Sequence, residues 1–330
     1  MWANPATTIR NPVSQYQATV RIVGMRKVQN TMTTANKAGL GLLILIAIGM
    51  TGAVSLAAKP GSHPMVPAQE RPVLEHFATA AQALDRVLAT PARVVAFGEY
   101  HQTTETRKIQ SSLRRFTDEL LPAVAKLATD LVVETWVADG HCGTRETKVV
   151  EQVQTTTERP PETESEIVTL LKRAKAAGMA PHILALSCKD YRSVTGRDGE
   201  TDFAKMLTLT RDRLQGEVTR ALRAPRPAAS GREPWVAVYG GALHNDLYPA
   251  PGDRPFAFGR ALFAKVKGQY LEVDLFVPEY ILGDKRLAAE PWFDAFKEGI
   301  KAGDALLIRR SERSSIIVFP AHSAGIRQNE

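Results

Sequence analysis

Apolar and polar positions follow two alternating patterns along the chain, one typical of buried strands and one typical of amphipathic helices. Short runs rich in β-branched residues predict strands at 93–98 (RVVAFG), 131–134 (LVVE), 182–187 (HILALS) and 235–239 (WVAVY). Later runs predict three more strands, over 270–277, 305–309 and 315–319. Apolar residues at helical spacing predict helices over 74–87, 103–127, 165–178, 202–222, 258–267 and 291–302. Because strands and helices alternate, we expect an α/β fold with a mainly parallel central sheet flanked by helices on both faces.

Three parts of this pattern are less regular. Pro122 is expected to kink or divide the 103–127 helix. Residues 139–165 are polar, rich in Thr and Glu, and contain Pro160-Pro161, so we expect a long loop at the end of a strand. The last two predicted strands lie close together, which predicts an antiparallel hairpin at the edge of the sheet.

The formal net charge of +7 comes mostly from one end of the chain. Residues 1–57 hold five of the 42 basic residues and none of the 35 acidic residues. The rest of the chain is close to neutral, so the charge does not indicate a nucleic-acid-binding face.

Residues 39–58 (GLGLLILIAIGMTGAVSLAA) are uncharged and follow a basic segment. A basic segment, an apolar stretch and a small-residue exit before Ala57 or Ala58 are typical of a secretory signal peptide. An uncleaved anchor is the alternative, because about twenty apolar residues could just span a bilayer. We therefore interpret 1–58 as an export signal or N-terminal anchor, 59–72 as a flexible tether and 73–330 as a single domain. The protein is expected to be periplasmic or secreted, and to contact a membrane only through the first segment if that segment is uncleaved.

The chain has two cysteines, Cys142 and Cys188. In an exported protein they could form a disulfide, because Cys142 follows one predicted strand and Cys188 ends the next. Two free buried thiols, or a metal role together with His141, are the alternatives that the sequence leaves open.

Chemically reactive side chains follow three of the predicted strands. Glu99, Tyr100 and His101 follow the first, Glu134 ends the second, and His244 follows the fourth after Gly240-Gly241. Ligands of open α/β sheets gather beyond the carboxyl ends of the strands, so we expect these residues to line one pocket.

Two carboxylates and two imidazoles together suit hydrolysis. One Glu could accept a proton from water while the histidines polarise a carbonyl or hold a divalent metal ion. His101, His244, Glu99 and Glu134 would then be the metal ligands, since His and Glu are typical ligands of zinc-like ions. The structural alternative is that Glu99 and Glu134 form salt bridges with Arg107 or Lys108. The sequence has no Gly-x-Ser-x-Gly, so a serine hydrolase of the usual α/β type is not indicated.

The two Gly-x-x-His motifs, Gly98-Glu99-Tyr100-His101 and Gly241-Ala242-Leu243-His244, are separated by the strand ending in Glu134. In these features the chain resembles the superfamily of erythromycin esterases, ChaN-like haem-binding proteins, and TraB and Tiki proteins, with the ChaN-like branch closest.

The resemblance implies an α/β fold with a shared pocket and a different chemistry in each branch. The esterase-like and Tiki-like branches imply hydrolysis of an ester or amide bond in a small-molecule or peptide substrate, with Glu99, His101, Glu134 and His244 as catalytic residues. The ChaN-like branch implies a non-enzymatic haem or iron-binding protein, with Tyr100, His101 and His244 as candidate cofactor ligands.

Overall fold

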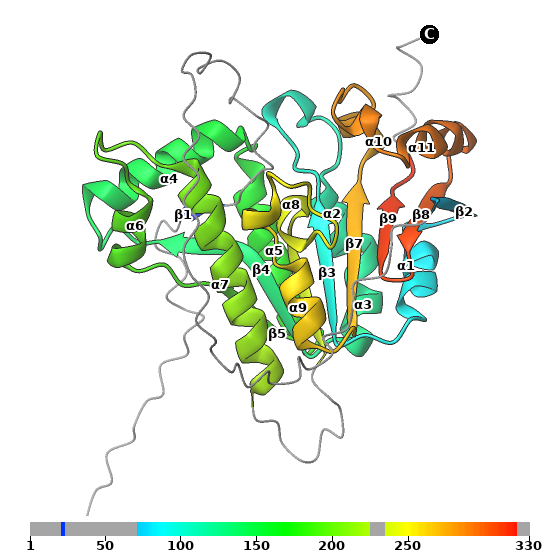
Figure 1. Ribbon diagram of the computed structural model, residues 1–330, viewed down its shortest axis with the longest axis horizontal. Coiled ribbons are helices and arrows are strands. Elements are labelled where there is room, and N and C mark those ends of the chain that lie inside the picture. The colour runs from blue at the N-terminus through cyan, green and yellow to red at the C-terminus, as the bar shows by residue number, and fades with distance from the viewer. Residues whose placement is uncertain (1–20, 24–70, 225–234, 322–330) are drawn as a thin grey trace, which may run out of the picture.

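The computed structural model describes residues 21–23, 71–224 and 235–321, and it has the predicted α/β fold (Figure 1). Its strands are β1 (Arg21–Val23), β2 (Val73–Phe77), β3 (Val94–Glu99), β4 (Asp130–Ala138), β5 (Ala180–Leu184), β6 (Val236–Gly241), β7 (Tyr270–Phe276), β8 (Ala305–Ser311) and β9 (Ser314–Val318). Its α-helices are α1 (Ala80–Leu88), α2 (Ser112–Arg115), α3 (Leu121–Leu127), α4 (Thr144–Thr157), α5 (Glu162–Ala176), α6 (Cys188–Val194), α7 (Phe203–Arg223), α8 (Ala242–Asn245), α9 (Gly259–Lys265), α10 (Pro278–Ile281) and α11 (Phe293–Gly299). The short helical turns are Thr104–Thr106, Phe116–Leu120, Arg254–Phe256, Leu287–Ala289 and Ile300–Ala302.

All described strands belong to one sheet in the order β1-β4-β6-β3-β7-β9-β8-β2, with β5 also paired to β4. Strands β5, β4, β6, β3, β7 and β9 pair in parallel, whereas β8 and β1 pair antiparallel to their neighbours. The mainly parallel sheet is therefore confirmed, and β8 and β9 form the predicted antiparallel hairpin. The hairpin is not the edge, because β2 pairs with β8 outside it.

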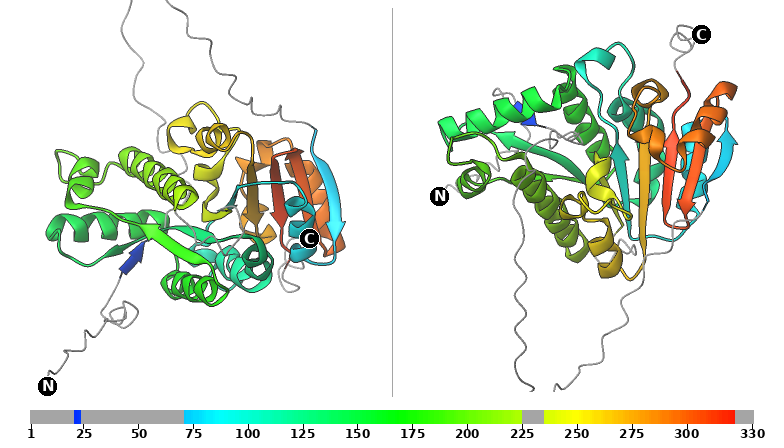
Figure 2. Two further views of the ribbon diagram at one scale, coloured as in Figure 1. Left: turned by 90° about the horizontal axis from the view of Figure 1, so that it is seen from below. Right: turned by 45° about the horizontal axis from the view of Figure 1, so that its top comes forward.

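Helices cover both faces of this sheet (Figure 2). On one face, Val95 and Phe97 of β3 belong to the apolar cluster that includes α1, α3, α5 and α11. On the other face, Val94 and Ala96 belong to the cluster that includes α4, α6, α7 and α9. Successive strand residues thus pack into different cores, which explains why the central strands are apolar throughout.

Two predictions at the beginning of the domain were wrong. Residues 73–77 form strand β2 rather than the start of a helix, and the helix begins at Ala80 after the N-cap Thr79. The Thr79 hydroxyl accepts a hydrogen bond from the Gln82 N–H, which fixes that boundary. The predicted 103–127 helix begins only after Ser111 and contains a π-helical turn over Phe116–Leu120, which ends two residues before Pro122.

The predicted loop at 139–165 is mostly helical. Helix α4 lies in the middle of it, and α5 begins at its end. Val149, Val150 and Val153 are fully buried against α6 and α7, so three apolar residues at helical spacing anchor a helix that is otherwise polar. Tertiary burial outweighs the low helix propensity of the neighbouring threonines.

The N-terminal predictions concern residues that are mostly outside the described part. Residues 39–58 and most of the tether lie there, so the export signal, anchor and cleavage stay predictions. The three-residue strand β1 pairs with the end of β4, although it belongs to the segment that the sequence places outside the domain. Among the described residues, no helix is both long and apolar enough to span a membrane.

Candidate functional site

The carboxyl ends of β3, β4 and β6 meet at one edge of the sheet, as the sequence predicts. In the register of the sheet, Glu99 of β3 lies opposite Gly241 of β6, and Val133 of β4 lies opposite Tyr239 of β6. Strand β4 does not end at Glu134, as expected from the sequence, but continues to Ala138 with an irregularity between Val133 and Trp136. Glu99, His101, Glu134 and His244 are all buried, with at most 5% of each residue exposed.

Glu99 is the centre of a charged cluster. Its Oε1 lies 2.6 Å from His101 Nδ1 and 2.7 Å from Arg159 Nη2, and its Oε2 accepts a 2.6 Å hydrogen bond from the Tyr239 hydroxyl. Arg159 Nη2 also contacts the His101 ring at Nδ1. Burial by itself would raise the pKa of Glu99, but His101, Arg159 and Tyr239 together lower it to about 2. Glu99 is therefore ionised at neutral pH, and its ion pair is with Arg159 rather than with Arg107 or Lys108.

Glu134 and His244 form a second pair. Glu134 Oε2 accepts a 2.7 Å hydrogen bond from the Gly241 N–H, whereas Oε1 has no hydrogen-bond partner among the described residues and lies 3.6 Å from His244 Nε2. Burial raises the pKa of Glu134 to about 8, against the opposing effects of Gly241 and Arg159. Glu134 thus keeps its proton at neutral pH, although the nearby Glu99 loses its own.

The tautomer of His244 follows from its other contact. Nδ1 lies 2.7 Å from the backbone carbonyl oxygen of Phe256. Since a carbonyl can only accept a hydrogen bond, Nδ1 carries the proton, and in the neutral ring Nε2 is the basic nitrogen. That nitrogen faces the carboxyl group of Glu134.

Glycine at two positions lets these groups approach one another. A Cβ atom added at Gly240 would lie 2.4 Å from Glu134 Oε2, and one added at Gly98 would lie 2.5 Å from Asn245 Oδ1. The carboxyl group of Glu134 therefore lies against the backbone of β6 at Gly240. Helix α8, which carries His244, packs directly on β3 at Gly98.

The four residues form two pairs rather than one ligand set. Alternation along the strands places Glu99 on the face of Phe97 and Glu134 on the opposite face, with Val132 and Trp136. Among the described residues, the groups of at least three His, Cys, Asp or Glu whose ligand atoms all lie within 4.8 Å of one another are His141–Cys142–Cys188 and Asp139–His141–Glu146. The Arg159 guanidinium also adds a positive charge beside Glu99 and His101. The predicted Glu99–His101–Glu134–His244 set does not fit a single divalent ion.

The predicted haem ligands have other contacts in this structure. The Tyr100 hydroxyl donates a 2.5 Å hydrogen bond to Asp284, and the His101 ring contacts Glu99 and Arg159. Tyr100 also packs edge-on against Phe276, with the ring centroids 6.3 Å apart. Iron ligation by Tyr100 would therefore replace its hydrogen bond to Asp284.

The sequence does not single out Arg159, which belongs to the predicted loop. It lies in the turn between α4 and α5, directly after Glu158, whose φ is +49°. No local pattern marks this residue, because only the fold of α4 and α5 brings it to Glu99.

A second buried charged cluster was also not predicted. Arg310 of β8 donates hydrogen bonds to Glu272 (2.8 Å) and Asp274 (2.9 Å) of β7. Asn245 at the end of α8 donates to Asp274 (3.3 Å), and Glu272 accepts from the Leu247 N–H (3.3 Å). This cluster therefore fixes the segment that carries His244. Two acidic residues at alternate positions of an apolar strand, YLEVDLF, were the signal that could have revealed it.

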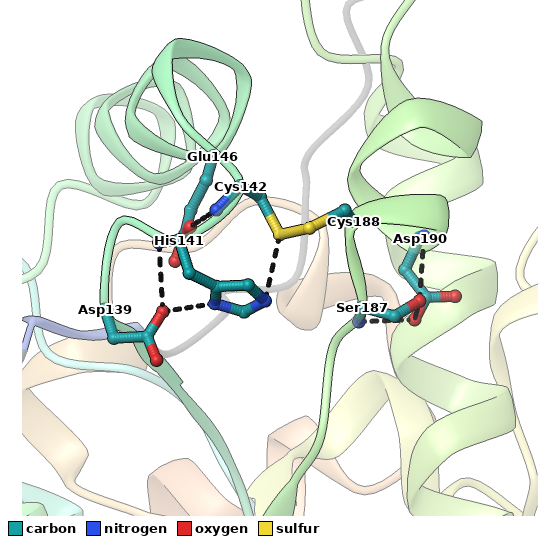
Figure 3. The surroundings of a disulfide bond; sticks show 7 residues. All are labelled: Asp139, His141, Cys142, Glu146, Ser187, Cys188 and Asp190. Carbon is teal, nitrogen blue, oxygen red and sulfur yellow. Dashed lines mark hydrogen bonds and ion pairs between the residues drawn. A yellow bond between two sulfur atoms is a disulfide. The ribbon is translucent and has the colours of Figure 1, made fainter.

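Cys142 and Cys188 form a disulfide, the first of the alternatives left open by the sequence (Figure 3). It joins the loop after β4 to the first turn of α6. His141, which the sequence linked to these cysteines, lies beside the bond with Nε2 3.4 Å from Cys142 Sγ.

Comparisons with known proteins add no relative, since no family model, no curated protein and no solved structure matches this chain.

Proposed function

We propose that this protein is a hydrolase that cleaves an ester or amide bond at the sheet edge formed by β3, β4 and β6. The observation that carries the proposal is the difference between two neighbouring buried glutamates. The pKa of Glu99 is lowered to about 2 and that of Glu134 is raised to about 8. Titratable pairs whose environments move their pKa values apart are typical of acid–base sites.

In this proposal Glu134 and His244 move protons. Glu134 holds a proton at neutral pH, and His244 Nε2 faces the Oε1 atom of Glu134 at 3.6 Å. This separation is too long for a strong hydrogen bond between the two groups. Protonated Glu134 can give its proton to the leaving group as a general acid, and the basic Nε2 of neutral His244 can accept a proton from the attacking water as a general base.

The Glu99 cluster supplies positive charge and fixed orientation. Although Glu99 and Glu134 lie on opposite faces of the sheet, the Arg159 charge acts on Glu134 as well, where it opposes the rise of the pKa. We assign to Arg159 and, when protonated, to His101 the stabilisation of negative charge that develops on a carbonyl oxygen at this edge. Glu99 Oε1 contacts both Arg159 and His101, and Glu99 Oε2 accepts a hydrogen bond from the Tyr239 hydroxyl. These contacts fix the orientation of the two cations. No step is assigned to a metal ion, because the four predicted ligands lie in two separate pairs.

The resemblance to the erythromycin esterase, ChaN-like and TraB–Tiki superfamily supports the same residues. The motifs Gly98–His101 and Gly241–His244 both contribute, one to each pair. If the predicted export signal is used, the protein would encounter its substrate outside the cytoplasm. We make no separate proposal for the haem-binding alternative, since in this structure the Tyr100 hydroxyl is bound to Asp284 and the His101 ring contacts Glu99 and Arg159.

The test is a screen of aryl esters, lactones and peptides with the wild-type chain and matched variants. Glu134→Gln keeps the shape of the acid and removes its transferable proton, so we expect turnover to fall by about 100-fold or more. Arg159→Met should reduce kcat by a similar factor. Glu162→Gln, at the exposed start of α5, serves as the control and should behave as wild type. Equal turnover by the Glu134 variant and the control would refute the proposal.

A further inference from the structure

A second group of chemically reactive side chains lies away from the glutamate pairs, at the loop after β4. The turn Gly140–Gly143 places His141 and Cys142 side by side, closed by a 2.9 Å hydrogen bond from the Gly143 N–H to the Gly140 carbonyl. Both glycines have positive φ, +80° and +70°, a conformation that residues with side chains rarely adopt. The turn thus has a defined shape in which the two central residues point toward Cys188 (Figure 3).

His141 is held in one orientation. Asp139 Oδ1 accepts the His141 N–H at 3.2 Å and also contacts ring atom Nδ1. Nε2 is thereby directed toward Cys142 Sγ, 3.4 Å away. A carboxylate that binds one ring nitrogen while the other faces a ligand position is the arrangement that orients metal-binding histidines.

We infer that Cys142, Cys188 and His141 form a redox-controlled zinc site, closed as a disulfide when oxidised and able to bind Zn²⁺ when reduced. The ligand atoms of the three residues lie within 4.8 Å of one another, and the two Cα atoms are 5.2 Å apart. Two thiolates and one imidazole are typical zinc ligands. Asp139 contacts the His141 ring, and Glu146 Oε2 accepts the Cys142 N–H at 3.0 Å, so neither carboxylate is counted among the three ligands.

The switch has two steps, reduction of the disulfide and binding of Zn²⁺. A dithiol reductant breaks the bond between Cys142 and Cys188, giving two thiols while the reductant closes into its own disulfide. Zn²⁺ then replaces the two thiol protons, which pass to solvent. Both His141 and Asp139 have side chains about 60% exposed, so an ion can enter from solvent. This inference does not depend on the proposed hydrolase activity.

The test uses the full chain, reduced without oxygen, freed of reductant and titrated with Co²⁺ as a spectroscopic probe. We expect a thiolate-to-cobalt charge-transfer band in the reduced protein, removed by Zn²⁺, and no such band in the oxidised protein. Asp139→Asn should weaken binding by about 10- to 100-fold. His141→Ala should weaken it at least as much, whereas His76→Ala, which removes an exposed histidine of β2, should have no effect.

Three results would overturn the inference. They are a reduced protein without the charge-transfer band, equal Co²⁺ affinity in the His141→Ala and His76→Ala variants, and loss of the circular dichroism signal on reduction. The last would mean that the thiols have no folded site when they are free. Esterase or peptidase activity is not part of the readout, so the two proposals can fail separately.

Discussion

Replacing Glu134 with glutamine should change how the stability of the fold depends on pH. The folded protein keeps the Glu134 proton up to about pH 8, whereas the unfolded chain releases it near the ordinary value of 4.5. Between these values the folded state binds more protons than the unfolded state. The free energy of unfolding therefore decreases as the pH rises, and the contribution is fully present only below the unfolded pKa.

The size of the effect follows from the two pKa values. A tenfold change in a proton equilibrium corresponds to about 1.4 kcal/mol, so moving the pKa of Glu134 from 4.5 to about 8 amounts to on the order of 5 kcal/mol. The glutamine side chain resembles the protonated acid, and its carbonyl oxygen can still accept the Gly241 N–H. Relative to wild type, Glu134→Gln should be nearly neutral at low pH and more stable by up to this amount once Glu134 is ionised.

Urea unfolding of both proteins at a series of pH values from about 5 to about 9 measures this difference. Glu99 stays ionised throughout this range, so its contribution is constant in both proteins. Burial also raises the pKa of Glu272, but that effect is common to both proteins and cancels in the difference. A difference in unfolding free energy that is independent of pH would refute the conclusion that Glu134 is buried as a protonated acid.

Three further predictions concern stability and are checked by the same urea unfolding. Arg310→Met should destabilise the fold by about 3–5 kcal/mol, because it leaves Asp274 buried without its cation and Glu272 without its hydrogen-bond donor. Arg309→Met on the same strand should cost about 1 kcal/mol or less, because its ion pair is partly exposed. Gly240→Ala should cost about 1–3 kcal/mol, since the new Cβ would meet the Glu134 carboxyl group. The double change Cys142→Ser with Cys188→Ser should cost about 4 kcal/mol, because the disulfide closes a loop with a sequence separation of 46.

The sequence predicts those parts of the fold whose pattern is strong and local. The apolar runs at β3, β6 and β7 are buried on both faces, so their composition alone distinguishes them from the helices that follow. Prediction failed where tertiary contacts outweigh a weak local pattern. Helix α4 has the composition of a polar loop, and only the burial of Val149, Val150 and Val153 against neighbouring helices makes it a helix.

The sequence predicted that Glu99, His101, Glu134 and His244 lie at one edge of the sheet, but not how they are arranged there. Glu99, His101, Glu134 and His244 all lie at the expected edge of the sheet, because parallel strands carry their carboxyl ends to one side. The sequence could not show on which face each carboxylate lies, since Glu134 belongs to a strand that continues past it. Nor could it identify Arg159, whose position depends on the packing of two helices.

The order of the strands explains why these residues meet at all. Along the chain β3 is followed by β4, but in the sheet β6 lies between them. This insertion brings Gly240 and Gly241 beside Glu134, where one gives the carboxyl group room and the other donates its N–H. It also brings the Tyr239 hydroxyl to Glu99 on the other face. Strand β6 therefore contacts both glutamates. It buries Glu134 against Gly240, where burial raises the pKa, and its Tyr239 hydroxyl stabilises the charge of Glu99. The contrast between the two glutamates therefore depends on that crossover connection, which no motif in the sequence encodes.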